Sequence, residues 1–249
     1  MSIVAKIIKN VFGIPPVCSA VIAAAGSSER MGGRDKLFIE IGGIPVIIHT
    51  IMSFSRCDYI DEIIVVVRGD SLEKVVALCK EYNILKVTKV MVGGDTRLES
   101  VINGVLAVSW KSELIAIHDG ARPCVDNRII EKTVLKATKR HAAAAGVSVN
   151  STLKRVKSNV ILETIDRQNM IEIQTPQTFN ADLIKAALKK AKKDNPSITD
   201  DCMAAELLGV PVYVTEGSRN NIKITTNEDI VIASAILGNG KLKMENGKL

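Results

Sequence analysis

Residues 23–36 read Ala-Ala-Ala-Gly-Ser-Ser-Glu-Arg-Met-Gly-Gly-Arg-Asp-Lys and follow directly on the apolar run Val-Cys-Ser-Ala-Val-Ile at 17–22. A buried strand is therefore expected to break into a turn of small residues, followed by two cations, Arg30 and Lys36. Small residues let backbone N–H groups approach a phosphate closely, and cations complement its charge. This stretch predicts a strand and loop that bind a nucleoside triphosphate.

The glycine spacing in this stretch disfavours two common phosphate-binding loops. It matches neither the Gly-x-x-x-x-Gly-Lys-Ser/Thr pattern of ATPases and GTPases nor the Gly-x-Gly-x-x-Gly pattern of dinucleotide folds. An Ala-Gly-Ser turn after a strand is also an ordinary connection to a helix. The loop alone therefore does not decide between a nucleotide site and a plain connection.

The rest of the chain alternates between apolar runs and amphipathic patterns. The runs that predict buried strands are residues 17–25, 63–68, 87–92, 114–118, 144–149 and 210–215. The patterns that predict helices are residues 45–54, 71–82, 96–110 and 127–141, with Ser71 as the expected N-cap of the second. Hydrophobic residues make up 47% of the 249 residues but aromatic residues only 3%, which suits an aliphatic parallel sheet buried on both faces. The pattern predicts an α/β fold that binds ligands at the carboxyl ends of its strands.

Composition argues against several classes of protein. The net charge is +6, but the basic residues are spread along the chain, and the densest cluster, at 185–193, is typical of a solvated helix face. Few aromatic residues also disfavour base stacking on nucleic acid. Five cysteines without a Cys-x-x-Cys pair favour free thiols in a reducing cytoplasm. No run approaches the ~18 apolar residues of a membrane span. We therefore expect a cytoplasmic protein without nucleic-acid or membrane partners.

Residues 148–173 break the alternation of strand and helix. They predict two short strands, 152–157 and 160–165, around Ser158 and Asn159, with polar alternation and little apolar surface. An isolated hairpin is only marginally stable in water, so this one should pack on something else. We expect a second subunit; the alternative is a hairpin that lies back on its own domain.

Two further loops carry residues suited to ion binding. Residues 93–97, Gly-Gly-Asp-Thr-Arg, follow a predicted strand and open a helix, where the glycines permit close backbone approach and the helix N-terminus favours an anion or a carbonyl. Residues 118–123, His-Asp-Gly-Ala-Arg-Pro, end another predicted strand. Asp119 is placed there to hold a divalent cation and Arg122 to bind phosphate, although an aspartate at such a place also serves as a cap or turn residue.

Two more segments give weaker signals. Residues 175–178, Thr-Pro-Gln-Thr, predict a rigid polar turn after a strand-like run. Residues 221–225, Asn-Ile-Lys-Ile-Thr, place Lys223 between apolar neighbours in a short extended segment. Such a lysine is either an edge residue or a charge directed into a site.

Eight motifs, each weak alone, occur in a fixed order along the chain. They are Ala-Ala-Gly-x-x-x-Arg-Met…Lys, Gly-Gly-Asp-x-Arg-x-x-Ser, His-Asp-Gly-Ala-Arg-Pro, Thr-x-Lys-Arg, Thr-Ile-Asp-Arg, Gln-Thr-Pro-Gln, Thr-Asp-Asp and Asn-Ile-Lys-Ile-Thr. Together they resemble the 2-C-methyl-D-erythritol 4-phosphate cytidylyltransferase family, CTP-dependent enzymes of the non-mevalonate isoprenoid pathway.

The resemblance implies an architecture as well as a function. It implies one Rossmann-like domain at 17–237 with a mostly parallel twisted sheet flanked by helices, between an N-terminal extension, 1–16, and a C-terminal tail, 238–249. It also implies that residues 148–173 form a protruding β-hairpin arm, exchanged between the two subunits of a homodimer.

The resemblance further implies a role for each matching residue. Those implied to bind CTP are Ala24, Ala25, Gly26, Arg30, Lys36, Gly94, Asp95, Ser100 and Asp119. Those implied to bind the methylerythritol phosphate are Asp119, Arg122, Thr152, Arg167, Thr175, Thr199 and Lys223, with Thr152 and Arg167 supplied by the partner's arm. The implied catalytic residues are Arg30, Lys36, Lys223 and Arg167, with Mg²⁺ near Asp119.

Three residues depart from the pattern of this family. Ser28 stands where a second glycine is frequent, Asp35 where many members have proline, and Ser151 where aspartate is usual. The first two lie in a loop that should tolerate them. Ser151 lies in the arm beside Thr152 and bears on the second-substrate site.

The implied reaction joins a sugar-alcohol phosphate to CMP and releases pyrophosphate. A phosphate monoester has a second pKa near ~6, so it is largely a dianion at neutral pH and needs no general base. The two substrates are both anions, and bringing them together instead needs preorganised positive charge. Two alternatives remain: a cytidylyltransferase for another polyol phosphate, such as ribitol 5-phosphate, and a nucleotide-binding regulatory module, which would not need Lys223 or the segment around Arg167.

Overall fold

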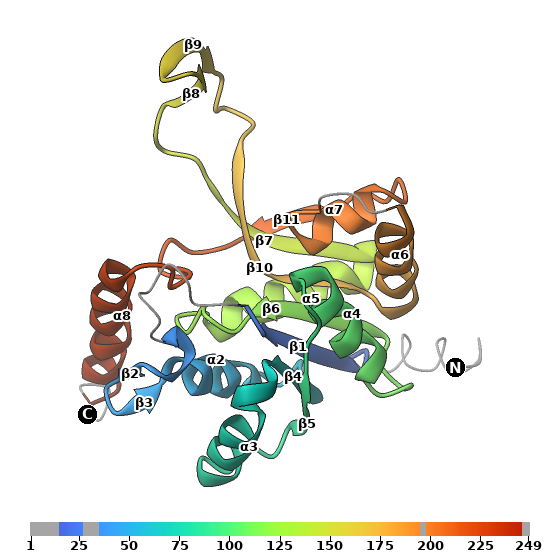
Figure 1. Ribbon diagram of the computed structural model, residues 1–249, viewed down its shortest axis with the longest axis vertical. Coiled ribbons are helices and arrows are strands. Elements are labelled where there is room, and N and C mark those ends of the chain that lie inside the picture. Colours follow the sequence, from blue (N-terminus) through green and yellow to red (C-terminus); the bar gives the residue numbers. More distant parts are fainter. Residues whose placement is uncertain (1–14, 27–34, 195–197, 246–249) are drawn as a thin grey trace.

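The computed structural model describes residues 15–26, 35–194 and 198–245, and a seven-stranded sheet forms its centre (Figure 1). The strands, in spatial order, are β11 (Tyr213–Glu216), β7 (Ala142–Ser148), β10 (Ile171–Asn180), β6 (Leu114–Asp119), β1 (Cys18–Ala24), β4 (Glu62–Val67) and β5 (Val87–Val92). Only β10 runs against its neighbours; the other pairings in this sheet are parallel. The predicted α/β class with a mostly parallel sheet is confirmed.

Helices cover both faces of the sheet (Figure 1). One face packs on α2 (Val46–Ser55), α3 (Leu72–Glu81) and α5 (Asn127–Arg140), and the other on α4 (Arg97–Ala107), α6 (Ala181–Asp194) and α7 (Asp201–Glu206). In β1, Ala20 and Ile22 enter the first core and Val21 enters the second. Side chains alternate between the faces of a strand, and both faces are covered here, so β1 is a continuous apolar run.

A third, smaller core lies beside the sheet. It includes Cys124 from the loop after β6 and Ile224 from the segment before the last helix. The 3₁₀ turn η2 (Lys36–Phe38) leads into the short pair β2 (Glu40–Ile41) and β3 (Ile44–Pro45), and β2 contacts helix α8 (Asn227–Glu245). Buried apolar residues fill the space between them: Ile41, Val46, Cys124, Ile224 and Ala233. Helix α8 continues past residue 237, the expected end of the domain.

The predicted hairpin forms and stands clear of the rest of the molecule (Figure 1). Strand β8 (Leu153–Lys157) pairs with β9 (Val160–Ile165), and Ser158 and Asn159 between them have φ values of 47° and 64°. Positive φ at both central residues is the two-residue turn that suits strand twist. Its large exposed apolar side chains are Val156, Val160, Ile161 and Leu162. The expectation of little apolar surface was therefore wrong, and the hairpin does not lie back on its own domain.

Two local expectations differ from the structure. Residues 175–178 are not a turn after a strand; they lie inside β10, with a cis peptide between Thr175 and Pro176. The polar run hid this strand because its buried side chains are paired: Gln177 Oε1 accepts hydrogen bonds from the backbone of Asp201 and Cys202, each at 3.0 Å. Ser71 precedes α3 but makes no capping hydrogen bond.

Some expectations fall on residues that the structure does not describe. Most of the extension at 1–16 and the loop at 27–34, which includes Ser28 and Arg30, lie outside the described residues. Among the helices that are described, none has both the length and the apolar character needed to cross a membrane.

Candidate active site

The carboxyl ends of β1, β4, β5 and β6 meet at one edge of the sheet and border a cavity of about 530 Å³. Open α/β sheets bind ligands at this edge. The lining residues are Ala23, Ala24, Ala25, Gly26, Lys36, Leu37, Arg68, Gly94, Asp95, Thr96, Arg97, Ser100, Asp119, Ala121 and Lys223. Every residue predicted to bind CTP lines this cavity except Arg30, which lies outside the described residues. The structure thus brings together loops that are far apart in the sequence.

The loop after β5 is held against the end of β1 by close backbone contacts. A Cβ atom at Gly93 would lie 2.5 Å from Ser100 Oγ and 2.7 Å from Ala25 Cβ, so only glycine fits without a shift. Ser100 Oγ accepts a hydrogen bond from Gly94 N at 3.1 Å and donates one to Thr96 O at 2.9 Å. One wall of the cavity is therefore built from a loop that these contacts hold in place.

Asp119, at the end of β6, lies among three cations. Lys223 Nζ is 2.9 Å from Asp119 Oδ2, and Arg122 Nε is 3.4 Å from the same oxygen. Arg97 Nε lies 3.7 Å from Oδ1. Within the described residues Oδ1 has no hydrogen-bond partner, so it is the less saturated of the two carboxylate oxygens.

The three cations decide the charge of Asp119. Burial alone would raise the pKa of this carboxyl, but Lys223, Arg97 and Arg122 outweigh burial and hold the pKa well below its usual range. The cluster therefore places one ionised carboxylate among three cations, of which Arg97 is also paired with Asp201. The surplus of positive charge faces a cavity that an anion can enter.

Lys36 is presented to the cavity by a short 3₁₀ turn. Asp35 begins this turn: its Oδ1 accepts a hydrogen bond from Leu37 N at 3.1 Å. Its Oδ2 is 2.7 Å from Arg68 Nη2, which lies at the end of β4 and also lines the cavity. Aspartate in place of the family's frequent proline thus ties the Lys36 segment to the sheet. The sequence signal for Arg68 was its position at the end of the apolar run 63–68.

Arg97 also lines the cavity; it belongs to the Gly-Gly-Asp-x-Arg-x-x-Ser motif, but no role was predicted for it from the sequence. Its guanidinium donates two hydrogen bonds to Asp201, at 3.0 and 2.7 Å, and Asp201 is fully buried in α7. Burial alone would lower the pKa of Arg97, but Asp201 and then Asp119 raise it, so Arg97 stays charged. A bidentate pair fixes the guanidinium plane as well as its position. Arg97 thus joins α7 to the end of β6.

The residues predicted to bind the second substrate are divided between two places. Thr175 Oγ1 accepts a hydrogen bond from Asp119 N at 3.1 Å, so Thr175 lies at the cluster with Arg122. Thr199 is exposed and does not line the cavity. Thr152 and Arg167 are exposed at the arm, outside their own chain's cavity. The chain alone therefore does not assemble all the residues predicted for this substrate.

The side chains around Asp119 determine which kind of metal site is possible there. Among the described residues, no three His, Cys, Asp or Glu side chains are placed to hold a metal ion together. Mg²⁺ is usually bound by one or two carboxylates together with substrate phosphates. Asp119 fits that arrangement, and it does not fit a metal site built from protein ligands alone.

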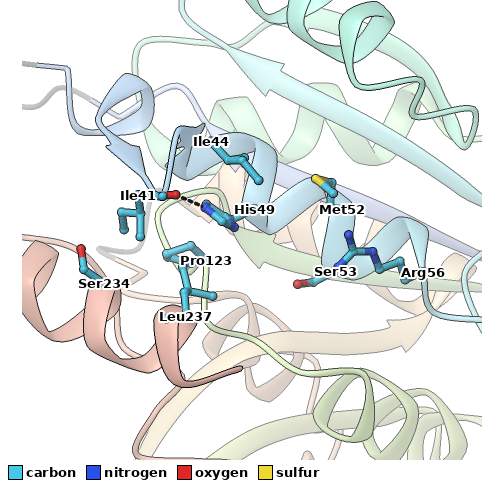
Figure 2. Close-up of a pocket in the computed structure, with 11 residues that line it drawn as sticks. Ile41, Ile44, His49, Met52, Ser53, Arg56, Pro123, Ser234 and Leu237 are labelled. Atoms are coloured by element: carbon cyan, nitrogen blue, oxygen red, sulfur yellow. Dashed lines mark hydrogen bonds between the residues drawn. The ribbon is translucent and has the colours of Figure 1, made fainter. Parts of the chain in front are cut away.

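A second cavity, of about 430 Å³, lies between the β2–β3 pair, α2 and α8 (Figure 2). Its lining is mainly apolar, and His49 within it points toward Ile41, with Nε2 2.8 Å from the carbonyl oxygen. None of the residues predicted for the site lines this cavity. The candidate site is therefore the Asp119 cavity.

The mostly parallel sheet, with small-residue loops, cations and the carboxylates of Asp95 and Asp119 at its carboxyl edge, is the arrangement expected of a nucleotidyltransferase. The model of the family described as IspD: 2-C-methyl-D-erythritol 4-phosphate cytidylyltransferase matches residues 18–239, so the chain belongs to this family. It is accordingly a CTP-dependent cytidylyltransferase of the non-mevalonate isoprenoid pathway.

Individual relatives agree with this assignment. The 2-C-methyl-D-erythritol 4-phosphate cytidylyltransferase of Halalkalibacterium halodurans is 42% identical over 220 residues, which are 88% of this chain and 96% of the relative. The enzyme of Clostridium novyi is 42% identical over 225 residues, 89% and 97% of the two chains. The crystal structure of 4-diphosphocytidyl-2C-methyl-D-erythritol synthase from Anaerococcus prevotii has a TM-score of 0.80 and 34% identity, covering 90% of this chain and 96% of that one.

Proposed function

We propose that this chain transfers CMP from CTP to 2-C-methyl-D-erythritol 4-phosphate, and that the transfer takes place in the Asp119 cavity. Family membership supports the reaction. The observation that carries the location is the cluster of Lys223, Arg122 and Arg97 around Asp119, in a cavity that Lys36 also lines. The products are 4-diphosphocytidyl-2-C-methyl-D-erythritol and pyrophosphate.

In the proposed step a phosphate oxygen of the methylerythritol phosphate attacks the α-phosphorus of CTP. A new P–O bond forms, the bond from the α-phosphorus to the oxygen bridging to the β-phosphorus breaks, and pyrophosphate leaves with the electron pair. The nucleophile is already ionised, so no side chain has to remove a proton. What the protein must supply is positive charge, fixed in place before the anions meet.

Two lysines and an arginine are proposed to supply this charge. Lys36 and Arg30 would hold the phosphates of CTP, and Lys223 would lie where the two substrates meet. The Lys223 side chain is 38% exposed while its ammonium is held 2.9 Å from Asp119. It is therefore oriented by a protein carboxylate and still open to the cavity.

Asp119 is proposed to be the one protein carboxylate that contacts Mg²⁺. The two oxygens of Asp119 differ: Oδ2 faces Lys223 and Arg122, and Oδ1 has only Arg97 near it. Oδ1 is the oxygen free to ligate, and CTP phosphates would complete the shell. When bound, Mg²⁺ would neutralise charge on the phosphates.

The arm is proposed to exchange between the subunits of a homodimer. Two observations support this: the hairpin stands clear of its own domain, and its exposed apolar side chains include Ile161 and Leu162. Thr152 and Arg167 would then complete the partner's cavity. The single chain leaves its own cavity without them, as an exchanged arm requires.

Pyrophosphate release tests the proposed function. We expect release with CTP and 2-C-methyl-D-erythritol 4-phosphate, much slower release with ribitol 5-phosphate or erythritol 4-phosphate, and none when EDTA is present in excess of the metal. Restoring Mg²⁺ should restore the rate. Equal rates with all the polyol phosphates would contradict the substrate assignment, and a full rate in EDTA would contradict the role of Mg²⁺.

The pH dependence of kcat/KM should reflect ionisation of the substrate phosphate rather than of a protein side chain. The cations hold the pKa of Asp119 low, and burial lowers the pKa of neighbouring His118 to about 3, so neither group changes charge between about pH 5 and 8. We expect kcat/KM to fall as the pH falls through ~6, where the substrate phosphate gains a proton. A phosphonate analogue with a higher second pKa should move this limb to higher pH. If kcat/KM falls at the same pH with the phosphonate, the ionising group belongs to the protein.

A further inference from the structure

One buried amide, Asn221, fastens the segment that carries Lys223. Asn221 is fully buried, and its Nδ2 donates hydrogen bonds to Thr175 O at 2.8 Å and to Gln174 Oε1 at 3.2 Å. Its backbone carbonyl accepts a hydrogen bond from Arg122 Nη1 at 2.8 Å. The residue therefore contacts β10 and the loop after β6 at once, two positions before Lys223 in the chain.

Two of the three partners of Asn221, Thr175 and Arg122, also hold Asp119. Thr175 accepts a hydrogen bond from the Asp119 backbone at 3.1 Å, and Arg122 Nε lies 3.4 Å from the Asp119 carboxylate. Asn221, Thr175, Asp119 and Arg122 thus form a closed ring of polar contacts. Lys223 spans the ring, because its ammonium lies 2.9 Å from the same carboxylate.

The neighbouring backbone is built to bring Gln174 and Asn221 together. Gln174 Nε2 donates to Ser218 O at 2.8 Å, and its Oε1 accepts from Ser218 N at 3.3 Å. A Cβ atom at Gly217 would lie 2.5 Å from Gln174 Oε1, so a side chain there would push the amide away. Ser218 and Gly217 therefore hold Gln174 in the position in which it accepts a hydrogen bond from Asn221.

The Asn221 side chain acts as a hydrogen-bond donor. Its two partners, the Thr175 carbonyl and Gln174 Oε1, are both acceptors, which fixes the orientation of the amide. Its own Oδ1 is buried without a hydrogen-bond partner in the described part of the chain. A buried acceptor without a partner is unfavourable for folding.

We propose that Asn221 is a positioning residue, which sets the distance between Lys223 and Asp119 without touching the substrates. The proposal rests on the proposed role of Lys223 in the reaction. Asn221→Ala is expected to lower kcat about 10²-fold, because small misplacements of a reacting arrangement have effects of that size. The KM for CTP should change little, since the recorded hydrogen bonds of the Asn221 side chain and carbonyl go to Thr175, Gln174 and Arg122 and not to residues 93–100. Asn220→Ala, an exposed neighbour, is the matched control and should keep the wild-type kcat.

A double-mutant cycle separates positioning from a general structural role. If Asn221 acts through Lys223, Asn221→Ala should lower kcat less than about threefold further in the Lys223→Ala background, because the two changes remove the same interaction. An equal factor in both backgrounds would overturn this inference alone. A Lys223→Ala variant with wild-type kcat would overturn the proposed role of Lys223, and this inference with it.

Asn221→Asp provides an isosteric test should the alanine variant not fold. A protonated carboxyl donates one hydrogen bond and an ionised carboxyl donates none. The ratio of the variant's kcat to the wild-type kcat should therefore rise as the pH falls, and taking the ratio cancels the ionisation of the substrate. A ratio that is constant with pH would contradict the need for a donor at this position.

Discussion

Replacing Lys223 by alanine is expected to lower kcat about 10²–10³-fold, the usual loss when one preorganised partner of a developing charge is removed. Lys223 Nζ is the cation nearest to Asp119, at 2.9 Å, and it lines the cavity from a segment outside the sheet. Its loss leaves Arg122 and Arg97 beside the carboxylate and raises the pKa of Asp119 from its depressed value. Steady-state kcat at saturating CTP and methylerythritol phosphate measures the effect, and Lys36→Ala should lower kcat by a similar factor.

The fold of the Lys223→Ala variant should survive. Its segment is fastened by Asn221 and by the hydrogen bond from Ile224 N to Ala121 O at 2.8 Å, and neither needs the lysine side chain. Thermal unfolding should therefore stay close to wild type. Lys136→Ala, on an exposed position of α5, controls for the loss of a charge far from the cavity. Near-normal kcat in both lysine variants at 36 and 223 would contradict the assigned site.

The cavity residues that could be predicted from the sequence are those whose position follows from the local pattern of strand and loop. Ala24, Gly94 and Asp119 each lie at or just after an apolar run, and parallel strands bring such ends to one edge. Two glycines in one loop indicated a close approach, and Gly93 does approach Ser100 and Ala25. The periodicity of the apolar residues and the glycines of the loops were sufficient to predict this part of the structure.

Other features depend on contacts that no local pattern encodes. Arg97 and Asp201 are 104 positions apart, and their pairing follows from α7 folding over the end of the sheet. The part of β10 at residues 175–178 was predicted as a turn because its buried glutamine and threonine side chains form hydrogen bonds in place of apolar packing. Asp35 was expected only to be tolerated, yet it begins the turn of Lys36 and pairs with Arg68. Such polar pairs become visible only when both partners are placed.

Complementation between two inactive variants is expected to restore activity if arms are exchanged. Arg167→Ala and Lys36→Ala should each have low activity as homodimers. In a heterodimer of the two, the chain that keeps Lys36 would receive an intact Arg167 from its partner, and the other chain would receive neither residue intact. One complete site in each dimer predicts about half of wild-type activity, since the two sites are related by symmetry. Tandem affinity tags isolate the heterodimer for the measurement.

A heterodimer with both substitutions in one chain is the second test, and it is expected to be inactive if the arms are exchanged. When both substitutions lie in one chain and the partner is wild type, an exchanged arm leaves each site with one defect, so this heterodimer should be inactive. If Arg167 instead serves its own chain, the wild-type subunit keeps a complete site and the activities of the two heterodimers are interchanged. Arg167 follows β9 in the arm and does not line its own chain's cavity, and Val156 and Val160 are exposed in the same arm. The first pairing is therefore the one that should work.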